Sequence, residues 1–265
     1  MKIGFIGIGN MATAIIAGMR AGGAFENDTL CGFNRSGEKT ADAAKRFGIE
    51  PCSSVFDTAA ACDVVVLCVK PQMLPDVLPD VRRAMDGEKL VVSIAAGKTL
   101  AYFADELGEN VPVIRVMPNM NAAVGASVSG ICPNSRATQE HIRLVRAMFN
   151  SVGSVMMLPE NMFSAFTAVA GSSPAFTYIY IDALASAAVK AGMPKPMAID
   201  AAAAAVMGSA KMLMESSQHP RAMADKVCSP GGTTIEGVLS LEESGFAGAV
   251  EKAVTAVIEK DHSLG

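Results

Sequence analysis

The sequence has no tryptophan, few residues of the other aromatic types and few charged residues. Aromatic residues make up 5% of its 265 residues, and Asp, Glu, Lys and Arg together make up 18%. Single-strand binding needs aromatic stacking platforms, and phosphate-backbone binding needs a basic patch. The formal net charge is −4 at pH 7, so nucleic acid is not expected as a partner. A hydrophobic fraction of 51% excludes wholesale disorder.

Metal-ligand patterns are also missing. The three histidines, His141, His219 and His262, lie far apart, and no two of the six cysteines have C-x-x-C spacing. A metal site is therefore not expected. A chain this long and apolar does not need disulfides for stability, so we expect reduced thiols and a cytoplasmic protein.

No stretch of the sequence resembles a convincing membrane span. Residues 3–19 are apolar, but Gly4, Gly7, Gly9 and Asn10 interrupt them, which favours a strand, a turn and a helix over a signal peptide. The longest uncharged stretch, residues 161–181, is broken by Gly171-Ser-Ser-Pro174. We therefore expect no membrane partner.

The first half of the chain alternates short apolar runs with segments of helical length. The predicted strands are 2–6, 29–33, 64–69, 90–94, 113–117, 124–131 and 152–157. The predicted helices between them are 11–22, 38–47, 74–85, 100–107 and 136–149. Continuous rather than alternating apolar runs indicate strands that are buried on both faces. The pattern predicts an α/β fold with a Rossmann-type, doubly wound parallel sheet over residues 1–158.

The second half, residues 159–265, is all-helical by prediction and rich in Ala, Met and Ser. Its expected helices are 161–170, 175–191, 196–216, 234–243 and 246–262. These helices have more apolar surface than one small layer can bury. We therefore expect a substrate-binding and dimerisation domain that makes the protein a homodimer, with helices exchanged between the two copies.

A glycine turn follows the first predicted strand. Residues 7–12 read Gly-Ile-Gly-Asn-Met-Ala, which matches G-x-G-x-x-A between a strand and a helix. Gly7 would form the tight turn, and Gly9 would let the backbone approach a pyrophosphate at the helix N-terminus. We assign dinucleotide binding to the turn residues Gly7, Ile8, Gly9, Asn10 and Met11; a purely structural turn is the alternative.

The end of the second predicted strand indicates which dinucleotide binds. It reads Asn34-Arg35-Ser36, without the acid that usually holds the ribose hydroxyls of NAD. A guanidinium, an amide and a hydroxyl can hold a 2′-phosphate, with Lys39 one turn further on. The sequence thus predicts NADP(H), with NAD(H) used less well; a polar turn with a solvated arginine is the alternative.

Two later strand ends are placed to contact the nicotinamide half of the cofactor. Ligands of open parallel sheets bind at the carboxyl ends of the strands. The residues concerned are Val69, Lys70 and Pro71 after one strand, and Ala95, Ala96 and Gly97 after the next. Taken alone, Lys70 could equally be an ordinary surface lysine.

A Ser-Pro-Gly-Gly-Thr-Thr loop, residues 229–234, joins two predicted helices. Backbone N–H groups near Gly231, Gly232 and Thr233, at the helix start, can bind a carboxylate. The hydroxyls of Ser229, Thr233 and Thr234 can hydrogen-bond a substrate heteroatom. The alternative is that one of the two threonines only caps the helix.

Together these motifs resemble the pyrroline-5-carboxylate reductase family. The resemblance extends over nearly the whole chain and rests on residues 7–12, 69–72, 93–97, 115–119 and 229–234. It implies reduction of 1-pyrroline-5-carboxylate to L-proline by NAD(P)H, the last step of proline biosynthesis. It also implies an N-terminal Rossmann-type domain, a helical domain that intertwines with a partner, and contact of the Thr234 hydroxyl with the imine nitrogen. Two segments depart from the family pattern: Met120-Asn121, where Thr-Pro is usual, and Ser173, where Gly is usual.

Two other functions fit the same architecture. A β-hydroxy-acid dehydrogenase usually needs a lysine base in its second domain, and Lys190 and Lys211 are the candidates in this chain. A non-enzymatic sensor would bind NADP and respond through its helices. The hydroxyl loop favours an enzyme over a sensor.

Overall fold

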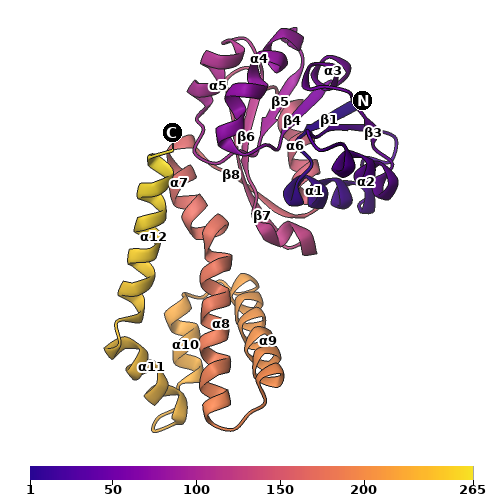
Figure 1. Cartoon of the computed structure of the whole chain (residues 1–265). Coiled ribbons are helices and arrows are strands. Elements are labelled where there is room, and N and C mark those ends of the chain that lie inside the picture. The colour runs from indigo at the N-terminus through magenta and orange to yellow at the C-terminus, as the bar shows by residue number, and fades with distance from the viewer. Residues whose placement is uncertain (265) are drawn as a thin grey trace. The chain divides into compact units, whose positions relative to one another are not determined.

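The computed structural model describes residues 1–264, which form two compact units (Figure 1). One unit contains Met1–Ser172 together with the end of the chain from Val257 onwards, and the other contains Ser173–Ala256. The segment 159–172 and the last helical turns therefore lie with the N-terminal unit. As a division between functions, the boundary after residue 158 stays a prediction.

An eight-stranded sheet forms the centre of the N-terminal unit. Its strands are β1 Lys2–Ile6, β2 Thr29–Phe33, β3 Glu50–Pro51, β4 Val64–Leu67, β5 Leu90–Ser93, β6 Val113–Met117, β7 Ser127–Pro133 and β8 Gly153–Met157. Their order is β3-β2-β1-β4-β5-β6-β7-β8. All neighbours are parallel except β6 and β7. The predicted doubly wound sheet is confirmed.

Helices cover both faces of this sheet. They are α1 Asn10–Ala21, α2 Gly37–Phe47, α3 Val55–Ala61, α4 Leu74–Ala84, α5 Leu100–Leu107 and α6 Gln139–Asn150. One core cluster contains buried side chains of α1, α2 and α6, and the other contains those of α3, α4 and α5. Strands β4 and β5 are buried at every position because they have a cluster on each face.

A π-helical segment replaces the break predicted at residues 171–174. After η3 Glu160–Met162, the short helix α7 Phe163–Phe166 runs through the π-helical Thr167–Ser172 into α8 Ser173–Lys190. Pro174 has no N–H to donate to the carbonyl of Ala170, four residues earlier. That carbonyl instead accepts a 2.9 Å hydrogen bond from Nδ2 of Asn119. The freed acceptor is thus satisfied without ending the helix.

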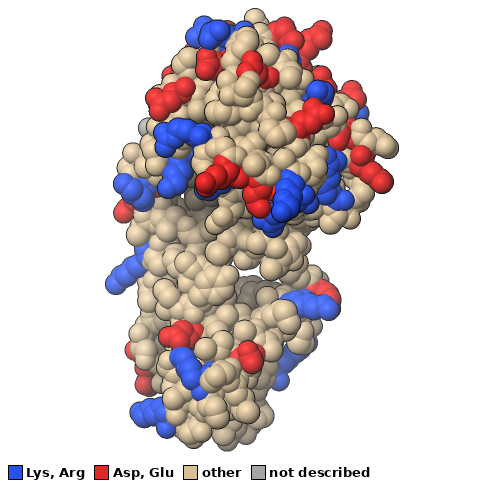
Figure 2. Space-filling view, turned by 45° about the vertical axis from the view of Figure 1, so that its right-hand side comes forward, with Lys and Arg blue, Asp and Glu red and all other residues tan. Residues whose placement is uncertain are grey.

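The helical unit contains α8, α9, α10, α11 and the first part of α12. Beyond α8, these helices span α9 Lys195–Met214, α10 Pro220–Val227, α11 Thr233–Glu243 and α12 Phe246–His262. Many large apolar side chains of this unit are exposed, among them Met207 and Met214 at 70% and 85%. Figure 2 shows broad areas of this unit without charged side chains. By length and composition, α9 is the one helix among residues 1–264 that could cross a membrane, with a mean hydropathy of 1.3.

Candidate functional site: a cofactor turn and a hydroxyl loop

The first part of the site lies where the strand order of the sheet reverses. Strands β1 and β4 are neighbours, and the crossovers that follow them cover opposite faces. The carboxyl ends of the two strands lead into Gly7–Met11 and Val69–Pro71, respectively. Open parallel sheets bind nucleotides at this position, so the fold brings two of the predicted cofactor segments together.

The two glycines of the turn have different local reasons to be glycine. Gly7 has φ = +93°, and a Cβ there would lie 2.9 Å from Cγ1 of Val69 and 3.0 Å from backbone atoms. A side chain at Gly7 would therefore strain the backbone and collide with Cys68 and Val69, which follow β4. A Cβ at Gly9 would meet no atom within 4 Å. Gly9 thus borders open space, as it must if a pyrophosphate approaches it.

The start of α1 also suits an anion. Gly9 is the N-cap, provides no side-chain hydrogen bond, and no acidic residue lies in the first turn. The N–H groups of the first turn are therefore free for a ligand and benefit from the positive end of the helix dipole. The residues present fit the pyrophosphate of a dinucleotide.

The Asn34 side chain holds the cofactor turn in place. Its Oδ1 accepts a 3.0 Å hydrogen bond from Ile8 N–H, and its Nδ2 donates to the Ser36 carbonyl at 3.2 Å. The Asn34 N–H in turn donates to Oγ1 of the buried Thr40 at 3.1 Å. Asn34 therefore ties the glycine turn to the loop after β2, a contact that sequence reasoning missed. Its predicted contact with the 2′-phosphate stays a prediction.

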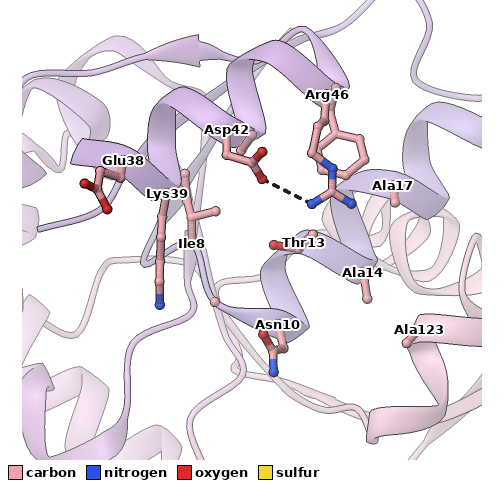
Figure 3. A pocket seen from close by; sticks show the side chains of 13 residues that line it. Ile8, Asn10, Thr13, Ala14, Ala17, Glu38, Lys39, Asp42, Arg46 and Ala123 are labelled. Atoms are coloured by element: carbon pink, nitrogen blue, oxygen red, sulfur yellow. Dashed lines mark hydrogen bonds and ion pairs between the residues drawn. The ribbon is translucent and has the colours of Figure 1, made fainter. Parts of the chain in front are cut away.

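Arg35 and Lys39 line different cavities. Arg35 borders a cavity of about 220 Å³ together with Gly7, Asn34, Val69 and other residues of the strand ends. Lys39 borders a cavity of about 590 Å³ between α1 and α2, which Ile8, Gly9 and Asn10 also line. Figure 3 shows the Lys39 and Asn10 side chains in this second cavity, with the Asp42–Arg46 ion pair further along α2. The two basic side chains that could bind the 2′-phosphate thus line different cavities, and both cavities border the glycine turn.

The third cofactor segment, Ala95–Gly97, forms a turn after β5. Ala95 N–H donates to Oγ of Ser93 at 3.3 Å, and Ser93 is buried. Gly97 has φ = +71°, so glycine is the residue that adopts this turn without strain. Parallel pairing of β4 with β5 puts the turn at the same edge of the sheet as Val69.

The helical unit contains the other group of predicted site residues, the hydroxyl loop Ser229–Thr234. Gly232 is the N-cap of α11 and Gly231 has φ = +66°. A Cβ at Gly232 would lie 2.3 Å from Oγ of Ser229, so the loop can close this tightly only with glycine there.

Thr233 and Thr234 are the first two residues of α11, and both are exposed. Neither hydroxyl hydrogen-bonds to any of the residues 1–264, and the helix has no side-chain cap. The alternative role of a threonine as N-cap is therefore wrong, because Gly232 occupies that position. Both hydroxyls and the N–H groups of the first turn are available to a ligand.

Two buried polar residues near the end of β6 also escaped the sequence analysis. Arg115 is 7% exposed, forms an ion pair with Glu160, and places its guanidinium 4.5 Å from the centre of the Phe163 ring. Asn119 is 5% exposed and makes the bond to Ala170 described above. Both lie in the quoted 115–119 motif, but their partners are about 45 to 51 residues away in the chain.

Comparison with known proteins identifies the family. Residues 160–264 match the family model for pyrroline-5-carboxylate reductase dimerisation, and residues 2–97 match the model described as NADP oxidoreductase, coenzyme F420-dependent. Pyrroline-5-carboxylate reductase from Escherichia coli is 43% identical over 99% of this chain and 98% of its own length.

Solved structures give the same result. The crystal structure of 1-pyrroline-5-carboxylate reductase from Streptococcus pyogenes superposes with a TM-score of 0.90 at 38% identity, covering 99% of this chain and 98% of the other. The Plasmodium falciparum pyrroline carboxylate reductase structure with NADP bound gives 0.88 at 29% identity, with coverages of 100% and 98%. The resemblance drawn from the motifs is confirmed: the chain belongs to the pyrroline-5-carboxylate reductase family.

Proposed function

We propose that this protein reduces the cyclic imine 1-pyrroline-5-carboxylate to L-proline with NADPH, the final step of proline biosynthesis. The observation that carries the proposal is the hydroxyl loop at the start of α11, where the Thr233 and Thr234 hydroxyls have no partner among residues 1–264. Family membership over the whole chain supports the same activity, and it supports NADP(H) as the cofactor. NADH is expected to serve less well.

Residues of the N-terminal unit would hold the cofactor, which supplies a hydride when bound. The turn Gly7–Met11 would bind the pyrophosphate with the N–H groups of α1. Arg35 and Ser36 would bind the 2′-phosphate, with Asn34 holding the loop in place. Two further segments, Val69–Pro71 and Ala95–Gly97, would hold the nicotinamide half at the edge of the sheet.

Residues of the helical unit would hold the substrate. The N–H groups of Gly231 and Thr233 would bind its carboxylate, assisted by the hydroxyl of Ser229 and by the positive end of the α11 dipole. The Gly232 N–H donates to the Ser229 carbonyl at 3.0 Å and so closes the loop around this position. The Thr234 hydroxyl would hydrogen-bond the ring nitrogen. A threonine hydroxyl is too weak an acid to be the final proton source, so the nitrogen would receive its proton from water or arrive protonated. The protein's contribution is then mostly orientation.

The alternative hydroxy-acid dehydrogenase has little support in the lysines it would need. Lys190 and Lys211 are both exposed, and Lys211 lies 3.9 Å from the Glu215 carboxylate. A general base needs burial or neighbours that lower its pKa. Neither lysine is buried.

We also propose that two copies of the chain bury the exposed apolar side chains of the helical unit, with α9 in the interface. The match of residues 160–264 to a dimerisation model supports this. Sedimentation at micromolar concentration is expected to show a dimer or a multiple of it, without detergent. An active monomer, or a need for lipid, would contradict the interface. We likewise propose that the protein is cytoplasmic, as expected if its cysteines are reduced thiols.

A substrate panel tests the proposed activity. In one assay, purified protein is mixed with NADPH and 1-pyrroline-5-carboxylate. In the other, it is mixed with NADP⁺ and a set of 3-hydroxy acids. We expect rapid NADPH oxidation with the imine, matched mole for mole by proline. Oxidation of a hydroxy acid without imine reduction would favour the dehydrogenase, and nucleotide binding without turnover would favour the sensor.

A further inference from the structure

The last described residue of the chain packs against the cofactor turn after β5. A Cβ added to Gly97 would lie 2.7 Å from Cβ of Leu264 and 3.5 Å from its carbonyl carbon and oxygen. Ordinary contacts begin near 3.4 Å, so Cβ of Leu264 lies directly on the Gly97 backbone. Gly97 is buried although Leu264 is 43% exposed. Leu264 thus covers one side of this turn.

Lys98 makes a second connection between the same two segments. Its Nζ donates a 3.0 Å hydrogen bond to the Leu264 carbonyl oxygen and lies 4.8 Å from the centre of the Tyr102 ring. The lysine follows Gly97 directly in the chain. A shift of Leu264 would therefore move both the glycine contact and the side chain of the next residue.

The end of α12 is itself held by buried contacts within the N-terminal unit. Asp261 is 8% exposed, and its Oδ2 accepts a 2.7 Å hydrogen bond from Oγ of Ser164 in α7. The Leu264 N–H donates to the Asp261 carbonyl at 3.1 Å. Figure 1 shows the end of α12 beside α7. These hydrogen bonds hold Leu264 in its position against the Ala95–Gly97 turn.

The other end of the turn is held as well. Glu160, at the start of η3, accepts a hydrogen bond from Leu100 N–H at 2.6 Å and pairs with Arg115. Leu100 begins α5 three residues after Gly97. Gly97, Glu160 and Asp261 line one cavity of about 660 Å³. Two contacts thus hold this part of the chain: Glu160 binds the residue that begins α5, and Leu264 packs against Gly97.

We infer that Leu264 and Lys98 are positioning residues that hold the Ala95–Gly97 turn against the nicotinamide half of the cofactor. This inference rests on the proposed function, because it uses the assignment of that turn to the cofactor. Hydride transfer is sensitive to small errors in position, so a turn that has lost one anchor orients the nicotinamide less well. The Asn34–Ser36 loop follows β2 and contains neither residue, so binding of the 2′-phosphate end stays unchanged.

Calorimetry with two nucleotides separates positioning from general stability. One nucleotide is NADPH, and the other is 2′-phospho-ADP-ribose, which has the adenine half but no nicotinamide. Leu264→Gly removes the Cβ that contacts Gly97, Leu264→Ala retains that Cβ, and Lys98→Met retains the stem but loses the donor. Glu259→Ala, at an exposed residue of α12, is the matched control.

We expect Leu264→Gly and Lys98→Met to weaken NADPH binding about three- to tenfold and to lower kcat by a similar factor. Binding of 2′-phospho-ADP-ribose should stay within twofold of wild type. Leu264→Ala, which restores the Cβ, should recover most of the loss, and Glu259→Ala should change nothing. Equal losses for both nucleotides, or no loss for either, would overturn the inference. Because the binding comparison needs no imine, failure of the proposed activity would appear separately, as absent turnover by the wild-type protein.

Discussion

Replacing Thr234 by Ala removes one hydroxyl that has no partner among residues 1–264. In the structure, the N-cap of α11 is Gly232, and the Thr234 side chain is exposed and accepts or donates no hydrogen bond within this part of the chain. The usual cost of about 1 kcal/mol for losing a threonine cap therefore does not apply. The melting temperature of Thr234→Ala should equal that of the wild type within about 1 °C, since exposed substitutions without contacts cost little.

Activity should respond differently. If the hydroxyl orients the imine nitrogen in the transition state, its loss should lower kcat/KM by about 100-fold, the size expected for one well-placed donor. That factor corresponds to about 2.7 kcal/mol of transition-state stabilisation. The assay is NADPH oxidation with 1-pyrroline-5-carboxylate, with the affinity for NADPH measured alongside. Cofactor affinity should stay unchanged because the cofactor segments lie in the other unit.

Two further variants sharpen this test. Thr234→Ser keeps the hydroxyl and should recover most of the activity. Thr233→Ala removes the neighbouring hydroxyl and should act mainly on KM, since the N–H that we assign to the carboxylate remains. Near-wild-type turnover by Thr234→Ala would refute the assignment. Equal losses in Thr234→Ala and Thr234→Ser would show that shape rather than the hydroxyl matters.

Arg35→Ala should raise the KM for NADPH about tenfold and leave NADH nearly unchanged, since a charged hydrogen bond contributes about 1.5–3 kcal/mol; equal losses with both nucleotides would argue against 2′-phosphate binding. Gly9→Val should retain the melting temperature, because Gly9 borders open space and has φ = −106°, yet nucleotide titration should detect no binding. Gly7→Ala should instead lower the melting temperature, because a positive φ and contacts near 3 Å oppose any side chain; an unchanged melting curve would contradict the packing against Cys68 and Val69. Asn119→Ala should lower the free energy of unfolding by about 1–3 kcal/mol in denaturant titration, since it leaves the buried Ala170 carbonyl unpaired, and an unchanged midpoint would show that this bond contributes nothing.

Short, continuous apolar runs between helical segments predicted the parallel sheet, because strands that are buried on both faces are apolar at nearly every position. Strands 2–6, 29–33 and 113–117 match the structure at both ends. Short elements escaped: β3 has two residues and α3 has seven, too few for a clear periodic pattern. The eight-residue α10 was also missed, although α5, of the same length, was predicted at both ends. Residues 120–124 form a 3₁₀ helix, so β7 begins at Ser127 rather than at 124.

Some features of the site could be predicted because they are local motifs, and others could not because they depend on contacts between distant residues. The glycine turn and the hydroxyl loop are local motifs, so their residues could be named from the sequence. The Asn34 bridge to Ile8 joins residues 26 apart, and the π-helical segment depends on Asn119, 51 residues from Ala170. Such contacts exist only once the fold brings the segments together. The threonine cap was excluded by backbone geometry, which residue types alone do not reveal.

Isotope transfer tests most directly the central claim that the cofactor turn and the hydroxyl loop serve one imine reduction. The wild-type protein is given 1-pyrroline-5-carboxylate and NADPH that carries deuterium at the transferable position of the nicotinamide. Mass spectrometry and NMR then locate the label in the product. The account predicts L-proline with one deuterium on the ring carbon that was the imine carbon. Proline without deuterium, or no proline while the protein still binds NADPH, would contradict it.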